Sequence, residues 1–308
     1  MPRKNLQERL NRTMPLLIDG ATGTELQRRG VTTSLPLWSA HALVDSGGLR
    51  ILEAIHADYA RAGAQILVTN TFRTTRRALE RAGRGADWRP FNERAVRAAR
   101  DGAAAAGADC LVAGGIAPLE DCYRPDLVPS AAACREEHRR QAGLLAGLGV
   151  DLIIIETMNH AREAEAALSA ARDTGLEVIL SLCPKGPAHL LSGEPLDEVV
   201  PRLLRAGGPR LRAILLNCAP PPVLEQVYPR LAELAGGLPH GLYAHLGEPD
   251  DIVGWRLPEE HAPEAYAAWM ADRLRQGARV IGGCCGTAPG HIAALARLAG
   301  SGLAPERG

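Results

Sequence analysis

Short runs of β-branched and other apolar residues alternate along the chain with longer segments in which apolar residues recur at helical spacing. Leu49, Leu52, Ile55 and Tyr59 illustrate a helical segment. Several of these segments end at a glycine shortly before the next apolar run, as is typical of the turn between a helix and a buried parallel strand. The expected strands are residues 16–20, 66–70, 111–116, 152–157, 177–182, 213–218, 241–246 and 280–285.

This alternation of strands and helices, without a shift in composition, predicts an α/β fold. We expect a single (β/α)8 TIM barrel with its site at the C-terminal ends of the strands. The barrel should comprise residues 15–302, after an N-terminal extension of residues 1–14. A doubly wound open sheet is the alternative, although no Gly-x-Gly-x-x-Gly motif follows a strand. Long loops are expected after strands, on the face that carries the site: residues 31–38, 118–130, 183–195 and 247–263.

Composition and charge narrow the classes of function. Apolar residues make up 46% of the chain and charged residues 23%, which is ordinary for a globular protein with a sizeable core. The formal net charge is zero, so attraction to nucleic acid or to an anionic membrane is not expected. The first residues lack the apolar core of a signal peptide, and the longest apolar stretch, residues 144–155, is too short to span a membrane. We therefore expect a cytoplasmic protein.

The motif Gly282-Gly283-Cys284-Cys285-Gly286-Thr287 lies where the last expected strand gives way to a helical pattern. Neighbouring side chains on a regular strand point to opposite faces, so both thiols reach one target only where the backbone bends. The glycines permit that bend, and Thr287 is expected to cap the following helix. Seven cysteines without a secretion signal favour reduced thiols. Alone, the cysteine pair is compatible with a metal site or with a strained redox disulfide.

Polar and thiol side chains follow the expected strands at the ends that meet on one rim of a barrel. Cys218 ends the sixth strand and should lie near Cys284 and Cys285 at the end of the eighth. Three thiolates with one open position are typical of a catalytic zinc site. A substrate thiol in that position would be deprotonated yet remain nucleophilic, which implies alkylation of a bound thiol. The other residues at strand ends are Asp19, Thr69, Asn70, Thr71, Glu156, Thr157, Cys183, Asn217 and His245.

Simpler roles are open for several of these residues. Asp19 and Glu156 could serve as helix caps or as partners in ion pairs. His245 fits a loop histidine better than a metal ligand. Away from the strand ends, isolated cysteines fit small buried hydrophobes, which applies to Cys110, Cys122 and Cys134.

The motifs together resemble those of the homocysteine S-methyltransferase family over nearly the whole chain. The matching segments are residues 19–26, Thr69-Asn70-Thr71-Phe72, Glu156-Thr157, Asn217-Cys218 and the motif from Gly282 to Thr287. The last two segments are the most specific. The resemblance implies a Zn²⁺ ion held by residues that match Cys218, Cys284 and Cys285, and homocysteine as the substrate that is methylated to methionine.

The resemblance also implies which residues hold the substrate. Asp19 and Glu156, with the backbone near Gly20 and the hydroxyl of Thr69, match residues that hold the amino-acid end of homocysteine. An ammonium group between two carboxylates would fix the direction in which the sulfur points. Asn217 is expected among the substrate-binding residues as well.

The methyl donor is the less defined half of the reaction. Trp38 resembles an aromatic position in relatives that use S-methylmethionine or betaine, whose cationic groups suit an indole face. Arg73 stands where betaine-using relatives have a tyrosine, which argues against betaine. The favoured donor is therefore a small sulfonium such as S-methylmethionine.

Two alternatives to this function are kept. The segments Thr69-Asn70-Thr71-Phe72 and Gly286-Thr287-Ala288-Pro289-Gly290-His291-Ile292 look more like the homocysteine-binding module of cobalamin-dependent methionine synthase, so the methyl group could come from a separate corrinoid protein. A zinc- or thiol-binding sensor without turnover is the second alternative. The sequence leaves open whether the protein is a homo-oligomer and whether the loop of residues 247–263 closes over the site.

Overall fold

Eight parallel strands form a barrel in the computed structural model, which describes residues 5–250, 254–257 and 262–301. Hydrogen-bonded neighbours follow the order β1-β12-β9-β8-β5-β4-β3-β2, and a parallel bridge between Ile18 and Ile66 joins β1 to β2. The predicted (β/α)8 TIM barrel is confirmed, and the open sheet is wrong. The strands are β1 (Leu16–Leu17), β2 (Ile66–Val68), β3 (Leu111–Ile116), β4 (Leu152–Met158), β5 (Glu177–Leu182), β8 (Leu211–Asn217), β9 (His240–Tyr243) and β12 (Val280–Ile281).

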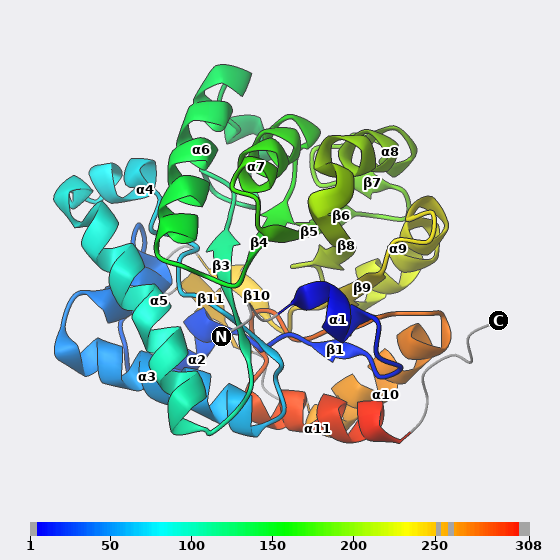
Figure 1. The fold of residues 1–308 in the computed structure, drawn as a ribbon, viewed down its shortest axis with the longest axis horizontal. Coiled ribbons are helices and arrows are strands. Elements are labelled where there is room, and N and C mark those ends of the chain that lie inside the picture. Colours follow the sequence, from blue (N-terminus) through cyan, green and yellow to red (C-terminus); the bar gives the residue numbers. More distant parts are fainter. Residues whose placement is uncertain (1–4, 251–253, 258–261, 302–308) are drawn as a thin grey trace.

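Helices lie around the strands as an outer ring (Figure 1). The helices are α2 (Thr22–Arg28), α3 (Ser46–Arg61), α4 (Arg76–Arg81), α5 (Trp88–Ala105), α6 (Ala131–Gly147), α7 (Ala161–Asp173), α8 (Leu196–Gly207), α9 (Pro221–Leu234), α10 (Pro263–Arg275) and α11 (Pro289–Gly300). Short 3₁₀ helices are η1 (Trp38–Leu43), η2 (Gly85–Asp87), η3 (Pro125–Leu127) and η4 (Gly208–Arg210).

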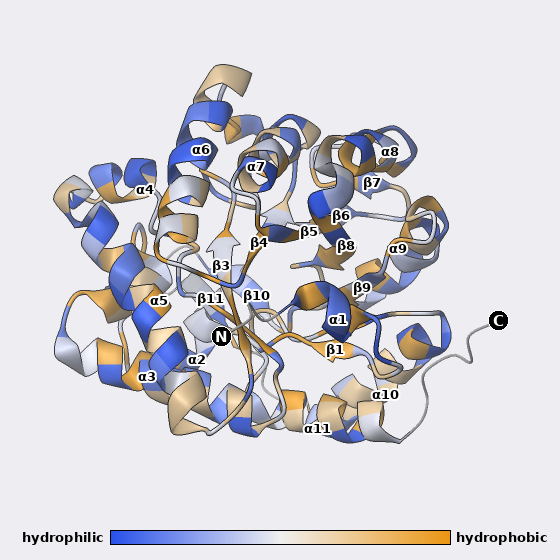
Figure 2. Ribbon diagram, in the orientation of Figure 1, coloured by the Kyte–Doolittle hydropathy of each residue, from blue (hydrophilic) through white to orange (hydrophobic). Residues whose placement is uncertain are grey.

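Side chains of the strands alternate between two apolar layers. In β4, Leu152 and Ile154 pack in the barrel interior, whereas Ile153 and Ile155 pack against the surrounding helices. This is the period of two expected for a strand, and both faces are apolar because helices cover the outer one. Figure 2 shows largely hydrophobic strands and helices that alternate between hydrophobic and hydrophilic residues. The barrel therefore has a filled core and carries its chemistry at its ends.

A short helix, α1 (Leu6–Leu10), closes the N-terminal end of the barrel. Both of its leucines are buried and pack with the inward-facing residues of the strands. Its first amide, that of Leu6, donates to Oε2 of Glu177 at 2.8 Å, and Glu177 begins β5. The polar segment before β1 thus seals the barrel at the end opposite to the long loops.

Two of the expected long loops contain antiparallel hairpins. Within residues 183–195, β6 (Pro184–Lys185) pairs with β7 (His189–Leu190). Within residues 247–263, β10 (Glu248–Asp250) pairs with β11 (Gly254–Arg256). Strands of two or three residues are too short for alternation to be recognised in a sequence. The rest of the second loop, including Asp251, lies partly outside the described residues.

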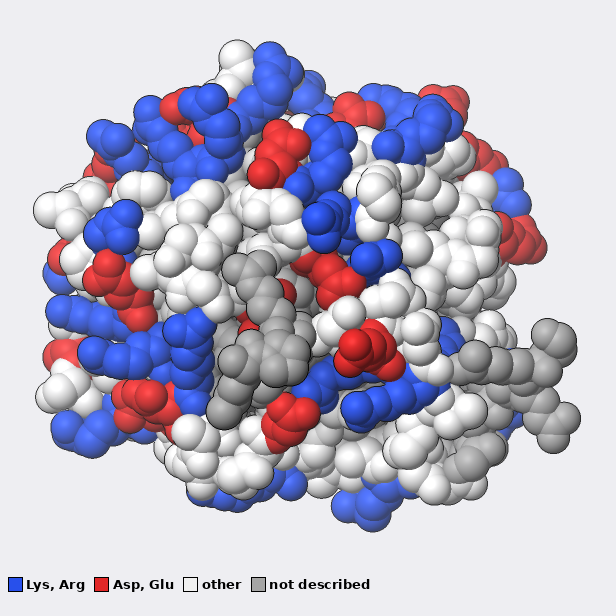
Figure 3. Space-filling model, in the orientation of Figure 1, with Lys and Arg blue, Asp and Glu red and all other residues white. Residues whose placement is uncertain are grey.

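The surface carries charges of both signs. On the face shown in Figure 3, basic and acidic side chains are interspersed, in line with the net charge of zero. No helix in the described part of the chain is long and apolar enough to cross a membrane.

Candidate active site

A cavity lies at the C-terminal ends of the strands. All nine residues that the sequence singles out as site residues line it: Asp19, Gly20, Trp38, Thr69, Glu156, Asn217, Cys218, Cys284 and Cys285. They come from β1, β2, β4, β8 and β12 or from the segments that follow these strands, and from η1. Their convergence follows from the barrel, because parallel strands present all their C-terminal ends on one rim.

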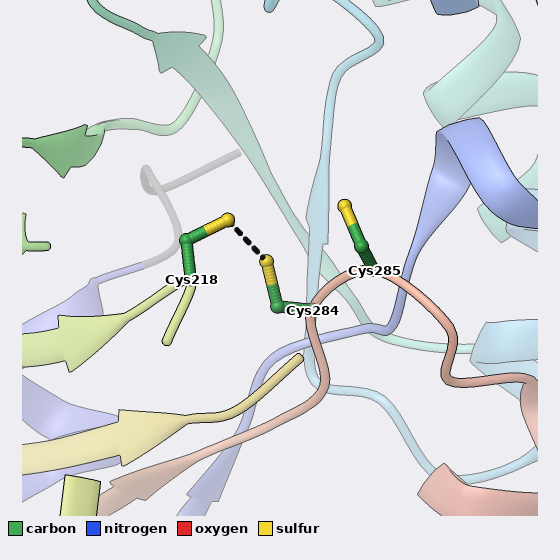
Figure 4. Close-up of side chains that lie close together, drawn as sticks. All are labelled: Cys218, Cys284 and Cys285. Carbon is green, nitrogen blue, oxygen red and sulfur yellow. Dashed lines mark hydrogen bonds between the residues drawn. The ribbon is translucent and has the colours of Figure 1, made fainter. Parts of the chain in front are cut away.

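Three thiols meet in this cavity (Figure 4). The Sγ atoms of Cys218 and Cys284 are 3.1 Å apart, and those of Cys218, Cys284 and Cys285 all lie within 4.8 Å of one another. Cys218 directly follows β8, whereas β12 ends at Ile281, so the other two lie in the loop beyond it. The expectation that the last strand would reach Cys285 is therefore wrong, and the loop itself directs both sulfurs toward Cys218.

Thr287 holds the turn that carries the thiol pair. Its Oγ1 donates to the Cys284 carbonyl at 2.8 Å and accepts from the amide of Ala21 at 3.2 Å. The expectation that Thr287 caps the next helix is wrong, because α11 begins after Ala288. The hydroxyl instead joins the loop after β12, which carries Cys284 and Cys285, to the segment after β1, which carries Asp19.

The thiol cluster fits a metal ion. Hydrogen bonds from Cys284 and Cys285 hold the pKa of Cys218 well below its usual range. Contacts with Cys218, together with burial, raise the pKa values of Cys284 and Cys285. Negative charge is thus concentrated within a group of soft sulfur donors, and the spacing suits one ion with bonds of about 2.3 Å to each sulfur.

Other cysteines stay outside this cluster. Cys183 donates from Sγ to the Cys218 carbonyl at 3.5 Å, and burial raises its pKa well above the usual value. Burial likewise raises the pKa of Cys122, which lines the cavity. Both therefore remain protonated thiols at neutral pH.

The carboxyl groups of Asp19 and Glu156, which the family resemblance assigns to the substrate, lie at the same cavity. Oδ2 of Asp19 accepts from the Val68 amide at 2.9 Å, and Oε1 of Glu156 accepts from the Tyr243 hydroxyl at 2.9 Å. Burial raises the pKa of Asp19 well above its usual value, and the neighbouring Glu156 raises it further. Burial raises the pKa of Glu156 to about 7, which the Tyr243 bond opposes. A cation between the two groups would favour their ionised forms.

Both polar atoms of the Asn217 side chain bond protein groups. Its Oδ1 accepts from the Thr157 amide at 3.0 Å and from Ser181 Oγ at 2.8 Å. Its Nδ2 donates to Thr157 Oγ1 at 3.0 Å. Because Thr157 follows Glu156, these bonds hold the end of β4 and with it the direction of the Glu156 side chain.

Backbone strain is concentrated at this cavity. Among the described residues, three that are not glycine have positive φ angles: Trp38 (46°), Thr157 (61°) and Cys218 (53°). All three line the cavity. Such conformations cost of order 1–3 kcal/mol each and persist where the surrounding structure imposes them, commonly at functional sites.

Aromatic side chains form another part of the wall. The rings of Trp38 and Phe72 meet edge to face with centroids 5.8 Å apart. Trp38 lies between two glycines, because a Cβ atom on Gly23 would come within 2.5 Å of its Cζ2, and one on Gly254 within 2.5 Å of its Cδ1. Glycine at both positions is therefore needed for the indole to occupy this place.

Two tyrosines of the site escaped the sequence reasoning. Tyr243 ends β9 and bonds Glu156, and its position at a strand end is a signal that could have identified it. The hydroxyl of Tyr123 lies 3.5 Å from Cys218 Sγ and 3.3 Å from His245 Nδ1. Tyr123 belongs to a long loop, and no local pattern distinguishes it.

Known proteins resemble this chain in sequence. A family model described as homocysteine S-methyltransferase matches residues 16–299. The homocysteine S-methyltransferase of Escherichia coli strain K12 is 36% identical, over 91% of this chain and 94% of its own. The S-methylmethionine–homocysteine S-methyltransferase of Rattus norvegicus is 31% identical, over 99% of this chain and 83% of that protein. Betaine–homocysteine S-methyltransferase 1 of Mus musculus is 29% identical, over 99% of this chain and 76% of that protein.

A solved structure also resembles this chain, in both fold and sequence. The metallated form of the homocysteine methyltransferase MmuM from Escherichia coli matches with a TM-score of 0.79 and 31% identity, covering 95% of this chain and 99% of that one. Fold and site thus define a (β/α)8-barrel transferase that gathers thiols and carboxylates around one cavity. The chain belongs to the homocysteine S-methyltransferase family, and it is an enzyme that methylates homocysteine. The alternative of a sensor without turnover is therefore set aside.

Proposed function

We propose that this enzyme transfers a methyl group from a small sulfonium donor, with S-methylmethionine favoured, to homocysteine in a zinc-dependent reaction. The observation that carries the proposal is the group of three sulfurs within 4.8 Å of one another, in a cavity that Asp19 and Glu156 also line. The thiols suit a metal that binds a substrate sulfur, and the carboxylates suit the ammonium group of an amino acid.

Cys218, Cys284 and Cys285 would hold the zinc ion. When bound, zinc lowers the pKa of a thiol at its open position and keeps the resulting thiolate nucleophilic. The backbone supports this role, because the left-handed Cys218 and the turn fixed by Thr287 aim the three sulfurs at one point. The ligands are thus preorganised by strands and by hydrogen bonds.

Asp19 and Glu156 would hold the ammonium group of homocysteine. Each uses one carboxylate oxygen to accept a protein hydrogen bond, Asp19 from the Val68 amide and Glu156 from the Tyr243 hydroxyl, so that its direction is set. The second oxygen of each is then available to the substrate. Binding of the ammonium lowers the raised pKa values of both groups and draws them into their charged forms.

The donor would lie against the aromatic wall of Trp38 and Phe72. A sulfonium is a cation that an indole face attracts, by about 0.5–2 kcal/mol. The homocysteine sulfur forms a bond to the methyl carbon while the bond from that carbon to the sulfonium breaks, and its electron pair stays on the departing thioether. The thiol proton of homocysteine is released to solvent. The rat relative named for S-methylmethionine supports this choice of donor.

The direct test uses purified protein of known zinc content. Zinc-loaded protein is incubated with homocysteine and, separately, S-methylmethionine, betaine or a methylated corrinoid protein, and methionine is measured. We expect near-stoichiometric zinc and turnover with S-methylmethionine. Cys284→Ser should lose both, whereas Cys183→Ser, which alters a cysteine outside the cluster, should keep both. Turnover that needs the corrinoid protein would support the alternative donor, and full activity of Cys284→Ser would remove the zinc proposal.

A further inference from the structure

Among the described residues, a single basic side chain lines the cavity. Among the described residues that line it, Arg73 is the one Lys, Arg or His, whereas Asp19, Asp121, Glu156 and Asp250 contribute carboxyl groups. A guanidinium in such surroundings is suited to an anionic group on a ligand, because its planar fork matches a carboxylate.

The guanidinium of Arg73 is held in place, but it has no carboxylate partner among the described residues. Its Nη1 donates to the Glu120 carbonyl at 3.2 Å. Its Nε has no hydrogen-bond partner in the described part of the chain, and no ion pair involves Arg73 there. By contrast, the nearby Arg77 and Arg81 both pair with the Glu120 carboxylate. The structure thus satisfies the neighbouring arginines and leaves the cavity-lining one for a partner from outside.

Arg73 stands on the aromatic side of the cavity. Its guanidinium carbon lies 5.7 Å from the centroid of the Phe72 ring, and that ring contacts the indole of Trp38. The indole is the proposed contact of the sulfonium. A ligand whose cation meets Trp38 therefore has a guanidinium within the same wall to meet an anion.

We propose that Arg73 binds the carboxylate of the methyl donor and thereby selects onium donors that carry one. This inference rests on the proposed function, since it concerns the donor side of the same cavity. S-methylmethionine carries its carboxylate three carbons from the sulfonium, so a single molecule can offer a cation to the indole and an anion to the guanidinium. Arg73 is a specificity residue in this scheme, and it takes no part in the bond changes.

The test compares S-methylmethionine with its carboxamide, which keeps the sulfonium and loses the negative charge. With the wild-type enzyme, kcat/KM for the carboxamide should be about 10- to 100-fold lower, as expected for loss of a charge-assisted hydrogen bond. Arg73→Gln should lower kcat/KM for S-methylmethionine by a similar factor and leave the carboxamide and the KM of homocysteine unchanged. Arg73→Lys should recover part of the loss.

Arg76→Gln is the matched control, because Arg76 is exposed, pairs with Glu80 and does not line the cavity. Arg76→Gln should leave kcat/KM unchanged for both S-methylmethionine and its carboxamide. Equal losses for both donors in Arg73→Gln, or a raised KM for homocysteine, would overturn the assignment. If the wild type methylates homocysteine with neither sulfonium, the proposed function fails by itself. In that case the binding of S-methylmethionine to wild type and to Arg73→Gln is measured by calorimetry. Binding to wild type but not to Arg73→Gln supports the assignment. Equal affinity for the two proteins, or binding to neither, refutes it.

Discussion

The hydroxyl of Tyr243 donates a 2.9 Å hydrogen bond to Oε1 of Glu156, although 87 residues separate the two in the sequence. Tyr243 ends β9 and Glu156 lies near the end of β4, so the bond crosses the rim of the barrel. It opposes the effect of burial on the pKa of Glu156 and directs the carboxylate that we propose for the homocysteine ammonium.

Tyr243→Phe should therefore weaken homocysteine binding. Loss of a hydrogen bond to a charged group costs about 1.5–3 kcal/mol, so the KM for homocysteine should rise about 10-fold or more. The KM for the donor should stay near its wild-type value. Tyr228→Phe is the control, because Tyr228 bonds His240 and does not line the cavity. Steady-state kinetics with each substrate varied in turn measures the effect, and an equal rise in both KM values would contradict it.

Glu156→Gln should change how stability depends on pH. The pKa of Glu156 is about 7 in the folded protein, above its ordinary value of 4.5, and Asp19, Cys218 and Tyr243 are the titratable groups that influence it or are influenced by it. A raised pKa means that its contribution to stability is complete below pH 4.5 and is lost as the pH rises through 7.

Glutamine stays neutral and can still accept from Tyr243. The melting temperature of Glu156→Gln without substrate should therefore exceed that of wild type above pH 7, and the difference should shrink toward pH 5. Both proteins are compared at matched metal content. A difference that is the same at every pH would show that the charge of Glu156 is not its cause.

Asn217→Ala should impair homocysteine binding through Glu156. The substitution leaves the Thr157 amide and the Ser181 hydroxyl without their partner, which costs about 1–3 kcal/mol of stability. It also releases the strained end of β4, so the KM for homocysteine should rise. In a Glu156→Gln background the same substitution should add little to that KM, because the group it positions is already altered. Full additivity of the two effects would argue against the positioning role.

Removal of metal should expose three particular thiols. After chelation, Cys218, Cys284 and Cys285 should react with iodoacetamide faster than in zinc-loaded protein, and activity should return when zinc is added before alkylation but not after it. Cys134 serves as the internal control, since it is buried away from the cavity. Mass spectrometry of the alkylated peptides measures the pattern. Protection of other cysteines instead of these three would contradict the proposed ligands.

Gly23→Ala should disturb the donor side of the cavity. The added methyl group would come within 2.5 Å of the Trp38 ring, so the indole must shift. We expect the KM for S-methylmethionine to rise severalfold, with the KM for homocysteine unchanged. Gly143→Ala is the matched control, because Gly143 lies in α6 with no atom within 4 Å of the added carbon. That control should stabilise the helix by about 1 kcal/mol and leave both KM values unchanged.

The architecture followed from local patterns. Inward and outward apolar residues in strands such as β4 are visible as runs of β-branched residues, and the helices between them show their own period. Once a barrel is predicted, Cys218 and the pair at Cys284 fall on one rim whatever the details of packing. The sequence by itself therefore determined the barrel, the thiol cluster and the carboxylates that line the cavity with it.

Only the tertiary structure decided how these groups are held. The bond from Tyr243 to Glu156 and the approach of Tyr123 to Cys218 join residues 87 and 95 positions apart, and no local signal specifies such pairs. Asn217 adjoins a thiol in the sequence, yet its bonds go to Thr157 on another strand. Likewise, no local pattern in the sequence distinguishes Arg73 from the other arginines. In the folded protein Arg77 and Arg81 pair with Glu120, whereas Arg73 lines the cavity. Periodicity determines which face of an element is buried, whereas the partner that a polar side chain meets depends on how distant segments come together in space.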